Sequence, residues 1–216
     1  MALRIFTNLS SLNSQRAMSI NNARLGSALE RIATGIRLQR SGDDIAAMSV
    51  SESLRGDVTA LKQGAKNLND GISMIQMADG ALNEQSSILI RLREITTQSA
   101  TGTIGDTERA TLQLEFSALR SEFDRIANTT EFNSRKLLDG SLAASSSDTT
   151  VLQLGLDSSD NNRFDLNQKI NLTAITSSAL GFSTNSIATD TGALTAMANL
   201  TTAIEKLSAI RGRVGA

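Results

Sequence analysis

The most constraining feature of this sequence is an apolar residue that recurs every three or four positions through its second quarter. The series alternates steps of four and three without a break: Leu54, Val58, Leu61, Ala65, Leu68, Ile72 and Ile75. This spacing is a heptad seam, which is typical of helices that pack as coiled coils. The chain contains no proline, so the residue that most strongly breaks helices is absent. We therefore expect one helix from about residue 45 to residue 99.

The first forty residues predict a second amphipathic helix. Its apolar positions form a stripe on one helical face, made of Ile5, Leu9, Leu12, Leu25, Leu29 and Ile32. The stripe thins between Leu12 and Leu25, where only Ala17, Met18 and Ile20 continue it. We expect this helix to run over residues 1–40 and to stop at the Ser41–Asp44 segment. Gly42 suits the end of a helix, and Asp43 or Asp44 suits the N-cap of the next one.

Two further helices complete the predicted bundle. Apolar residues again step by four and three in the third, at Leu112, Phe116, Leu119, Phe123 and Ile126. Asp106 or Thr107 suits its N-cap, with Glu108 in its first turn. Because only a short loop separates it from the long helix, the two should pack antiparallel. A last helix begins at about Ala193.

Residues 128–149 lose the helical period, and a different pattern follows. Leu152, Leu154 and Leu156 alternate with their neighbours, and so do Phe164 and Leu166 after a turn-forming stretch over 157–162. This pattern predicts a β-hairpin near residues 150–168. The expected fold class is therefore mainly α, a long antiparallel helical bundle or coiled coil with a small β-hairpin region.

The absence of histidine and cysteine argues against an enzyme. Neither residue occurs in the 216-residue chain, which removes the usual ligands of zinc, copper and haem, the commonest general base and the thiol nucleophiles. We expect no cofactor and no metal. A formal net charge of −1 gives no general attraction to nucleic acid. No apolar run is long enough for a membrane helix or a cleaved signal peptide.

Several short segments resemble the bacterial flagellins, in the order and at the spacing of that family. They are Ala28–Arg37 (ALERIATGIR), Gly42–Ala47 (GDDIAA), Asn69–Ser73 (NDGIS), Asp79–Glu84 (DGALNE), Arg91–Ile95 (RLREI) and Thr129–Leu138 (TTEFNSRKLL). The hairpin region and the turn over 179–182 are also similar to the flagellin core. The resemblance is strongest over the first ~140 residues.

The resemblance implies a structural subunit of the flagellar filament that assembles with copies of itself for swimming motility. It also implies an extracellular location, reached through the flagellar export apparatus without a cleaved signal peptide. Residues 1–42 would be the filament-core helix and 43–216 a helical core domain that includes the start of the returning C-terminal helix. The family's C-terminal tail has no counterpart after Ala216, so we expect this chain alone to be monomeric.

Arg91, Ile95 and Glu115 match the flagellin surface that the vertebrate flagellin-sensing Toll-like receptor recognises. A guanidinium supplies a bidentate anchor, and an aliphatic side chain beside it supplies buried area. The alternative is that Arg91 and Glu115 are ordinary charges on a helix face that is solvated or buried in the filament.

The stripe over residues 1–40 has no expected partner within the chain. We therefore expect Ile5, Leu9, Leu12, Leu25, Leu29 and Ile32 to pack on neighbouring copies, and a contact that does not close makes an open polymer. Two other classes share some of these features: a hook–filament junction protein and a chemoreceptor-type signalling coiled coil. The hairpin argues against the second of these.

Overall fold

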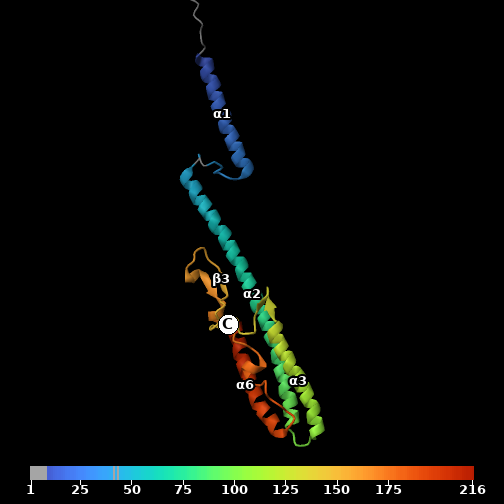
Figure 1. The fold of residues 1–216 in the computed structure, drawn as a ribbon. Helices are drawn as coiled ribbons and strands as arrows, with labels where there is room; N and C mark the ends of the chain where they lie inside the picture. Colours follow the sequence, from blue (N-terminus) through green and yellow to red (C-terminus); the bar gives the residue numbers. More distant parts are fainter. Residues whose placement is uncertain (1–8, 41, 43) are drawn as a thin grey trace, which may run out of the picture. The chain divides into compact units, whose positions relative to one another are not determined.

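The computed structural model describes residues 9–40, 42 and 44–216 (Figure 1). The chain divides into two units, residues 1–59 and residues 60–216, which are described separately. In chain order the elements are α1 (Leu9–Thr34), α2 (Ile45–Ser99), α3 (Asp106–Thr129), β1 (Glu131–Phe132), β2 (Arg135–Lys136), β3 (Val151–Gln153), the 3-10 helix η1 (Asp160–Asn162), β4 (Arg163–Asp165), α4 (Leu166–Ile170), α5 (Ser177–Leu180) and α6 (Asp190–Gly215).

Helix α1 ends earlier than the sequence predicts. Its last residue is Thr34, and Gly35 follows with φ +68°, the left-handed conformation that closes many helices. The Gly35 amide donates to the Arg31 carbonyl at 2.9 Å, and the Ile36 amide contacts the Thr34 hydroxyl. The predicted end at Gly42 was therefore wrong, because Gly35 already supplies the stop.

Helix α2 has the limits that the sequence predicts. The carboxylate of Asp44 accepts a hydrogen bond from the Ala47 amide at 3.0 Å, which is the N-cap interaction expected for this position. Asp43, the other predicted cap, lies outside the described residues. The helix then continues to Ser99 and supplies one wall of the second unit.

Three helices and the segments between α3 and α6 form the core of residues 60–216. The C-terminal part of α2 lies beside α3 and α6 (Figure 1). Buried side chains of these helices include Leu82, Leu89, Leu92 and Ile95 of α2, Phe116 and Phe123 of α3, and Leu200 and Leu207 of α6. The antiparallel packing of α2 and α3 is confirmed by two hydrogen bonds. Gln85, earlier in α2, donates to Phe123, later in α3, whereas Arg91, later in α2, donates to Glu115, earlier in α3.

The face of α2 that packs against the rest of its unit is not the predicted heptad seam. The buried positions before Leu82 are Gly64, Gly71, Met74 and Ala78. Leu54, Val58, Leu61, Ala65, Leu68 and Ile72 stay exposed, and Ile75 alone of the series packs partly against the core. Within the described chain, the prediction that this seam is a packed interface was therefore wrong.

Two glycines explain the change of face. A Cβ atom at Gly64 would lie 2.3 Å from the Leu154 carbonyl oxygen, and one at Gly71 would lie 2.3 Å from Leu152 Cδ1. Between them, Asn67 Nδ2 donates to the Gln153 carbonyl at 2.9 Å. The absence of two side chains thus lets β3 lie directly on the helix.

We expect Gly64→Ala to lower the free energy of unfolding by about 1–3 kcal/mol, because the methyl group must push a backbone carbonyl aside. Gly80→Ala is the matched control, since nothing lies within 4 Å of a Cβ there. That variant should be stabilised by up to about 1 kcal/mol through helix propensity. Urea unfolding followed by circular dichroism measures both. Equal stabilisation of the two variants would contradict the close approach of β3 to α2.

Helix α3 begins without a side-chain cap. Asp106 is its first residue, Gly105 occupies the N-cap position, and neither Asp106 nor Thr107 is the cap. The buried Arg109 stabilises the preceding turn instead. Its guanidinium donates to the Ser99 carbonyl at 2.9 Å and to the Thr101 carbonyl at 3.0 Å, so the connection between α2 and α3 is fixed from within α3.

The predicted β-hairpin is present, and a second small sheet accompanies it. β3 and β4 pair antiparallel with Leu152 opposite Phe164, and β1 pairs with β2. Leu166 begins α4 and does not extend the strand. The mainly helical fold class is confirmed. The boundary expected between residues 42 and 43 stays a prediction.

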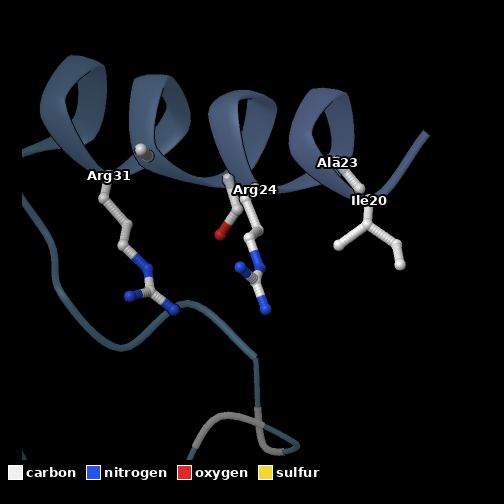
Figure 2. A pocket seen from close by; sticks show the side chains of 6 residues that line it. Ile20, Ala23, Arg24 and Arg31 are labelled. Atoms are coloured by element: carbon white, nitrogen blue, oxygen red, sulfur yellow. The ribbon is translucent and has the colours of Figure 1, made fainter. Parts of the chain in front are cut away.

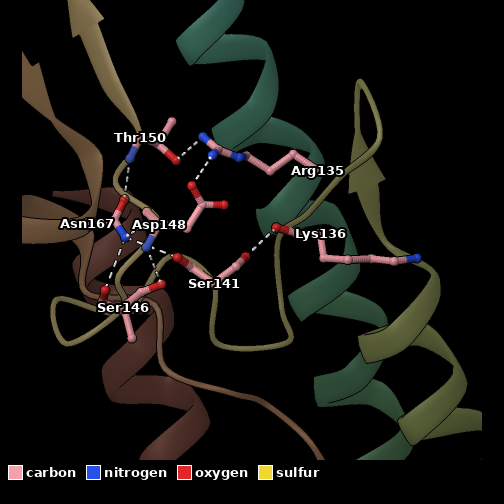
Figure 3. A network of polar contacts seen from close by, with 8 residues as sticks. Arg135, Lys136, Ser141, Ser146, Asp148, Thr150 and Asn167 are labelled. Carbon is pink, nitrogen blue, oxygen red and sulfur yellow. Dashed lines mark hydrogen bonds and ion pairs between the residues drawn. The ribbon is translucent and has the colours of Figure 1, made fainter.

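A buried asparagine joins the segments around the hairpin (Figure 3). The Asn167 Nδ2 group contacts three carbonyl oxygens, those of Ser141, Ala143 and Asp148, at 3.0–3.1 Å. Its Oδ1 accepts from the Thr150 amide at 2.9 Å. One side chain thus satisfies backbone groups that no helix or sheet pairs.

Candidate functional site

The predicted self-assembly stripe lies on a helix that buries none of its residues. Leu9 is 71% exposed, Leu29 57% and Ile32 78%. Leu12 and Leu25 are also exposed, and Ile5 lies outside the described residues. A helix with this much uncovered apolar surface gains little stability from its own chain.

A second face of α1 carries arginine. An open hollow of about 710 Å³ is lined by Ile20, Ala23, Arg24, Ser27, Ala28 and Arg31. In Figure 2 the side chains of Arg24 and Arg31 point to the same side of the helix. Because one helix supplies all six residues, the hollow is a shallow surface rather than a pocket that could enclose a small ligand.

The exposed α2 residues form a second uncovered apolar strip. We call Leu54, Val58, Leu61, Leu68 and Ile72 the α2 seam; their exposed fractions lie between 43% and 57%.

No cysteine, histidine, aspartate or glutamate cluster in the described part of the chain could hold a metal ion. None of the described helices is long and apolar enough to cross a membrane.

Two of the three predicted receptor-binding residues are brought together. Arg91 Nε lies 2.9 Å and Nη2 2.7 Å from Glu115 Oε1, so one carboxylate oxygen receives both N–H groups. Glu94, which sequence reasoning missed, lies 2.8 Å from Arg91 Nη1. Its position three residues after Arg91 on the same helix is the signal that could have revealed it.

These three side chains form an exposed ion cluster. Hydrogen bonds from Arg91 to Glu94 and to Glu115 raise the pKa of the guanidinium above its ordinary value. Arg91 is 47% exposed and Glu115 40% exposed. Exposed ion pairs usually contribute little to stability. The cluster is therefore a preformed arrangement of charge on the surface between α2 and α3.

Ile95 does not belong to this surface. It is fully buried in the core of the second unit with Leu89 and Leu92. Its side chain is therefore out of reach of a partner that binds the outer face of α2. The resemblance placed Ile95 on the receptor-binding surface with Arg91, but in the structure its side chain is buried.

Long helices with uncovered apolar stripes are typical of structural proteins that pack against other chains. The comparison with known families is more specific: the profile of the "Bacterial flagellin N-terminal helical region" matches residues 5–143. The chain belongs to the bacterial flagellin family.

The relatives and solved structures agree with this assignment. A flagellin of Clostridium tyrobutyricum is 47% identical over 134 residues, which are 62% of this chain and 36% of that protein. A "flagellar filament 30.7 kDa core protein" of Treponema maltophilum is 34% identical over 97% of this chain and 75% of its own length. A crystal structure of Bacillus cereus flagellin is also similar, with 31% sequence identity and a TM-score of 0.56. The match covers 68% of this chain and 79% of the solved chain. The chain thus spans about a third of the Clostridium relative.

Proposed function

We propose that this chain is a structural subunit of a bacterial flagellar filament and has no enzymatic activity. The protein that contains this chain assembles with copies of itself outside the cell, where the flagellar export apparatus delivers it. The observation that carries this proposal is α1, a helix of 26 residues with no buried side chain and with exposed leucine and isoleucine side chains near both of its ends.

In an assembled filament, the α1 stripe and the α2 seam would be buried against neighbouring copies of the subunit. A fully buried valine, leucine or isoleucine side chain contributes about 1.5–3 kcal/mol. The described stripe residues of α1 and the α2 seam together offer ten exposed side chains of this kind: Leu9, Leu12, Leu25, Leu29, Ile32, Leu54, Val58, Leu61, Leu68 and Ile72. Contacts between unlike surfaces produce a helical polymer when they repeat without closing into a ring. The flagellin family membership supports that outcome over a closed oligomer.

Location in the cell tests this proposal against its alternatives. Antibodies raised against residues 60–216 should label filaments along their whole length in immunogold electron microscopy. Deletion of the gene should remove the label and impair swimming. Label confined to the base of the filament would instead indicate a hook–filament junction protein, and label at the inner membrane would indicate a signalling coiled coil.

A second proposed function is recognition by the vertebrate flagellin-sensing Toll-like receptor. The Arg91–Glu94–Glu115 cluster supports it, because a guanidinium held by two carboxylates presents its remaining face in one orientation. The buried Ile95 takes no part in this proposal. The aliphatic contribution must come from another side chain or from the stems of the charged residues.

We expect Arg91→Ala to weaken receptor activation about 30-fold or more, as truncation of a central anchor costs about 2 kcal/mol or more. Arg93→Ala is the matched control, since Arg93 is exposed and two residues away. Reporter cells that express the receptor measure the dose of purified protein needed for half-maximal signalling. Full activity of Arg91→Ala, or an equal loss in Arg93→Ala, would remove the basis for this assignment.

A further inference from the structure

The chain contains three Asp–Gly pairs: Asp70–Gly71, Asp79–Gly80 and Asp139–Gly140. The first two lie inside α2, where the helical hydrogen bonds fix the backbone and engage each glycine amide. The third lies outside every helix and strand. Aspartate followed by glycine is chemically labile, because no side chain shields the glycine nitrogen from the neighbouring carboxyl group.

The local geometry at Asp139 favours contact between the two reacting groups. Asp139 is exposed, and its Oδ1 accepts a hydrogen bond from the Ser141 amide at 2.9 Å. This hydrogen bond closes a ring that contains both Asp139 Cγ and the Gly140 nitrogen. The Gly140 N–H donates to no other described residue. The hydrogen bond therefore limits the rotation of the Asp139 side chain next to a glycine nitrogen that no described acceptor engages.

We propose that Asp139 is a site of spontaneous isoaspartate formation, and that α2 protects Asp70 and Asp79 from the same reaction. The Gly140 nitrogen attacks Cγ of the protonated Asp139 carboxyl group, loses its proton and expels one water molecule. The product is a five-membered succinimide. Water then adds to either ring carbonyl: opening at Cγ restores aspartate, and opening at the main-chain carbonyl leaves isoaspartate. No oxidant or reductant takes part.

Isoaspartate at position 139 alters the main chain, because the side-chain methylene becomes part of the backbone. The neighbouring loop has little room for this change. A Cβ at Gly140, which has φ +100°, would lie 3.2 Å from the nitrogen and Cβ of Ala174. Ser141 donates to the Lys136 carbonyl at 2.7 Å and accepts from the buried Asn167 at 3.0 Å (Figure 3). Modification should therefore loosen the contacts that join residues 138–150 to α4.

Ageing of the folded chain tests the proposal directly. The protein is incubated for weeks at mildly acidic pH and physiological temperature and then digested. Isoaspartate in each Asp–Gly peptide is quantified by separation of the isomers and by an isoaspartyl methyltransferase assay. We expect about tenfold or more isoaspartate at position 139 than at 70 or 79, because the helical sites react only after local opening. In urea-unfolded protein the three sites should react at similar rates.

Asp139→Glu is the matched variant, since its longer side chain would have to form a less favourable six-membered ring. It should abolish the methyltransferase signal from this peptide while the other two peptides stay unchanged. Hydrogen exchange of the aged wild-type protein should be faster over residues 138–150 than in fresh protein. Equal isoaspartate at the three sites of the folded chain, or more at 70 and 79 than at 139, would overturn the proposal.

Discussion

Phe123→Ala should lower the free energy of unfolding of residues 60–216 by about 3–5 kcal/mol, the usual effect of emptying a large aromatic site in a core. The Phe123 ring is fully buried and meets the edge of Phe182, with centroids 5.3 Å apart and an interplanar angle of 76°. Phe182 follows α5, so the substitution removes a contact between α3 and a segment about sixty residues later. Urea unfolding monitored by circular dichroism gives the midpoint and slope.

Leu114→Ala is the control for this prediction. Leu114 lies on the same helix but is 71% exposed, so its truncation should change stability by less than about 0.5 kcal/mol. If the two variants unfold at the same urea concentration, α3 does not pack through its phenylalanine face. If Phe123→Ala also reduces the slope, the core has lost its cooperative packing.

Long elements were the easiest to predict from the sequence. The limits of α2 follow from fifteen turns of helical sequence and from the Asp44 cap, whose hydrogen bond to Ala47 is present. Short elements gave no such signal. The β1–β2 turn places Asn133 and Ser134 at φ 49° and 63°, a conformation whose usual sequence sign is a glycine at the second position.

The packed face of α2 could not be predicted from apolar spacing alone. The heptad rule counts large side chains, whereas the structure uses Gly64 and Gly71 to admit β3 against the helix backbone. In the sequence these glycines indicate only a loss of helix propensity. Their role depends on Leu152 and Leu154, which lie more than eighty residues away in the sequence and pack there only after folding.

The candidate receptor surface was predicted in part. Arg91 and Glu115 meet because α2 and α3 run antiparallel, which the short loop indicated. Ile95 is buried because it continues the series Leu82, Leu89 and Leu92, whose spacing already belonged to the core face. The resemblance to flagellins located this region of the helix, but the apolar spacing of the chain itself was the better guide to whether Ile95 is exposed.

The largest functional effect is expected from Leu9→Asp combined with Leu29→Asp in the gene that encodes this chain. Both leucines are exposed on α1, so the substitutions should leave the fold of residues 60–216 unchanged. In an assembled filament each leucine would be buried, and a carboxylate in its place lacks a partner and disfavours the contact strongly. Because every subunit carries both changes, we expect filament assembly to be abolished.

Ser10→Asp combined with Ser27→Asp is the matched control, with the same added charge on α1 outside the stripe residues. Circular dichroism should show that both double variants keep the helix content of the wild-type protein. Electron microscopy of a flagellin-deficient strain that carries each gene is then the direct measurement. We expect filaments of normal length with the serine variant and none with the leucine variant. Normal filaments from the leucine variant would show that the apolar stripe of α1 does not hold the subunits together.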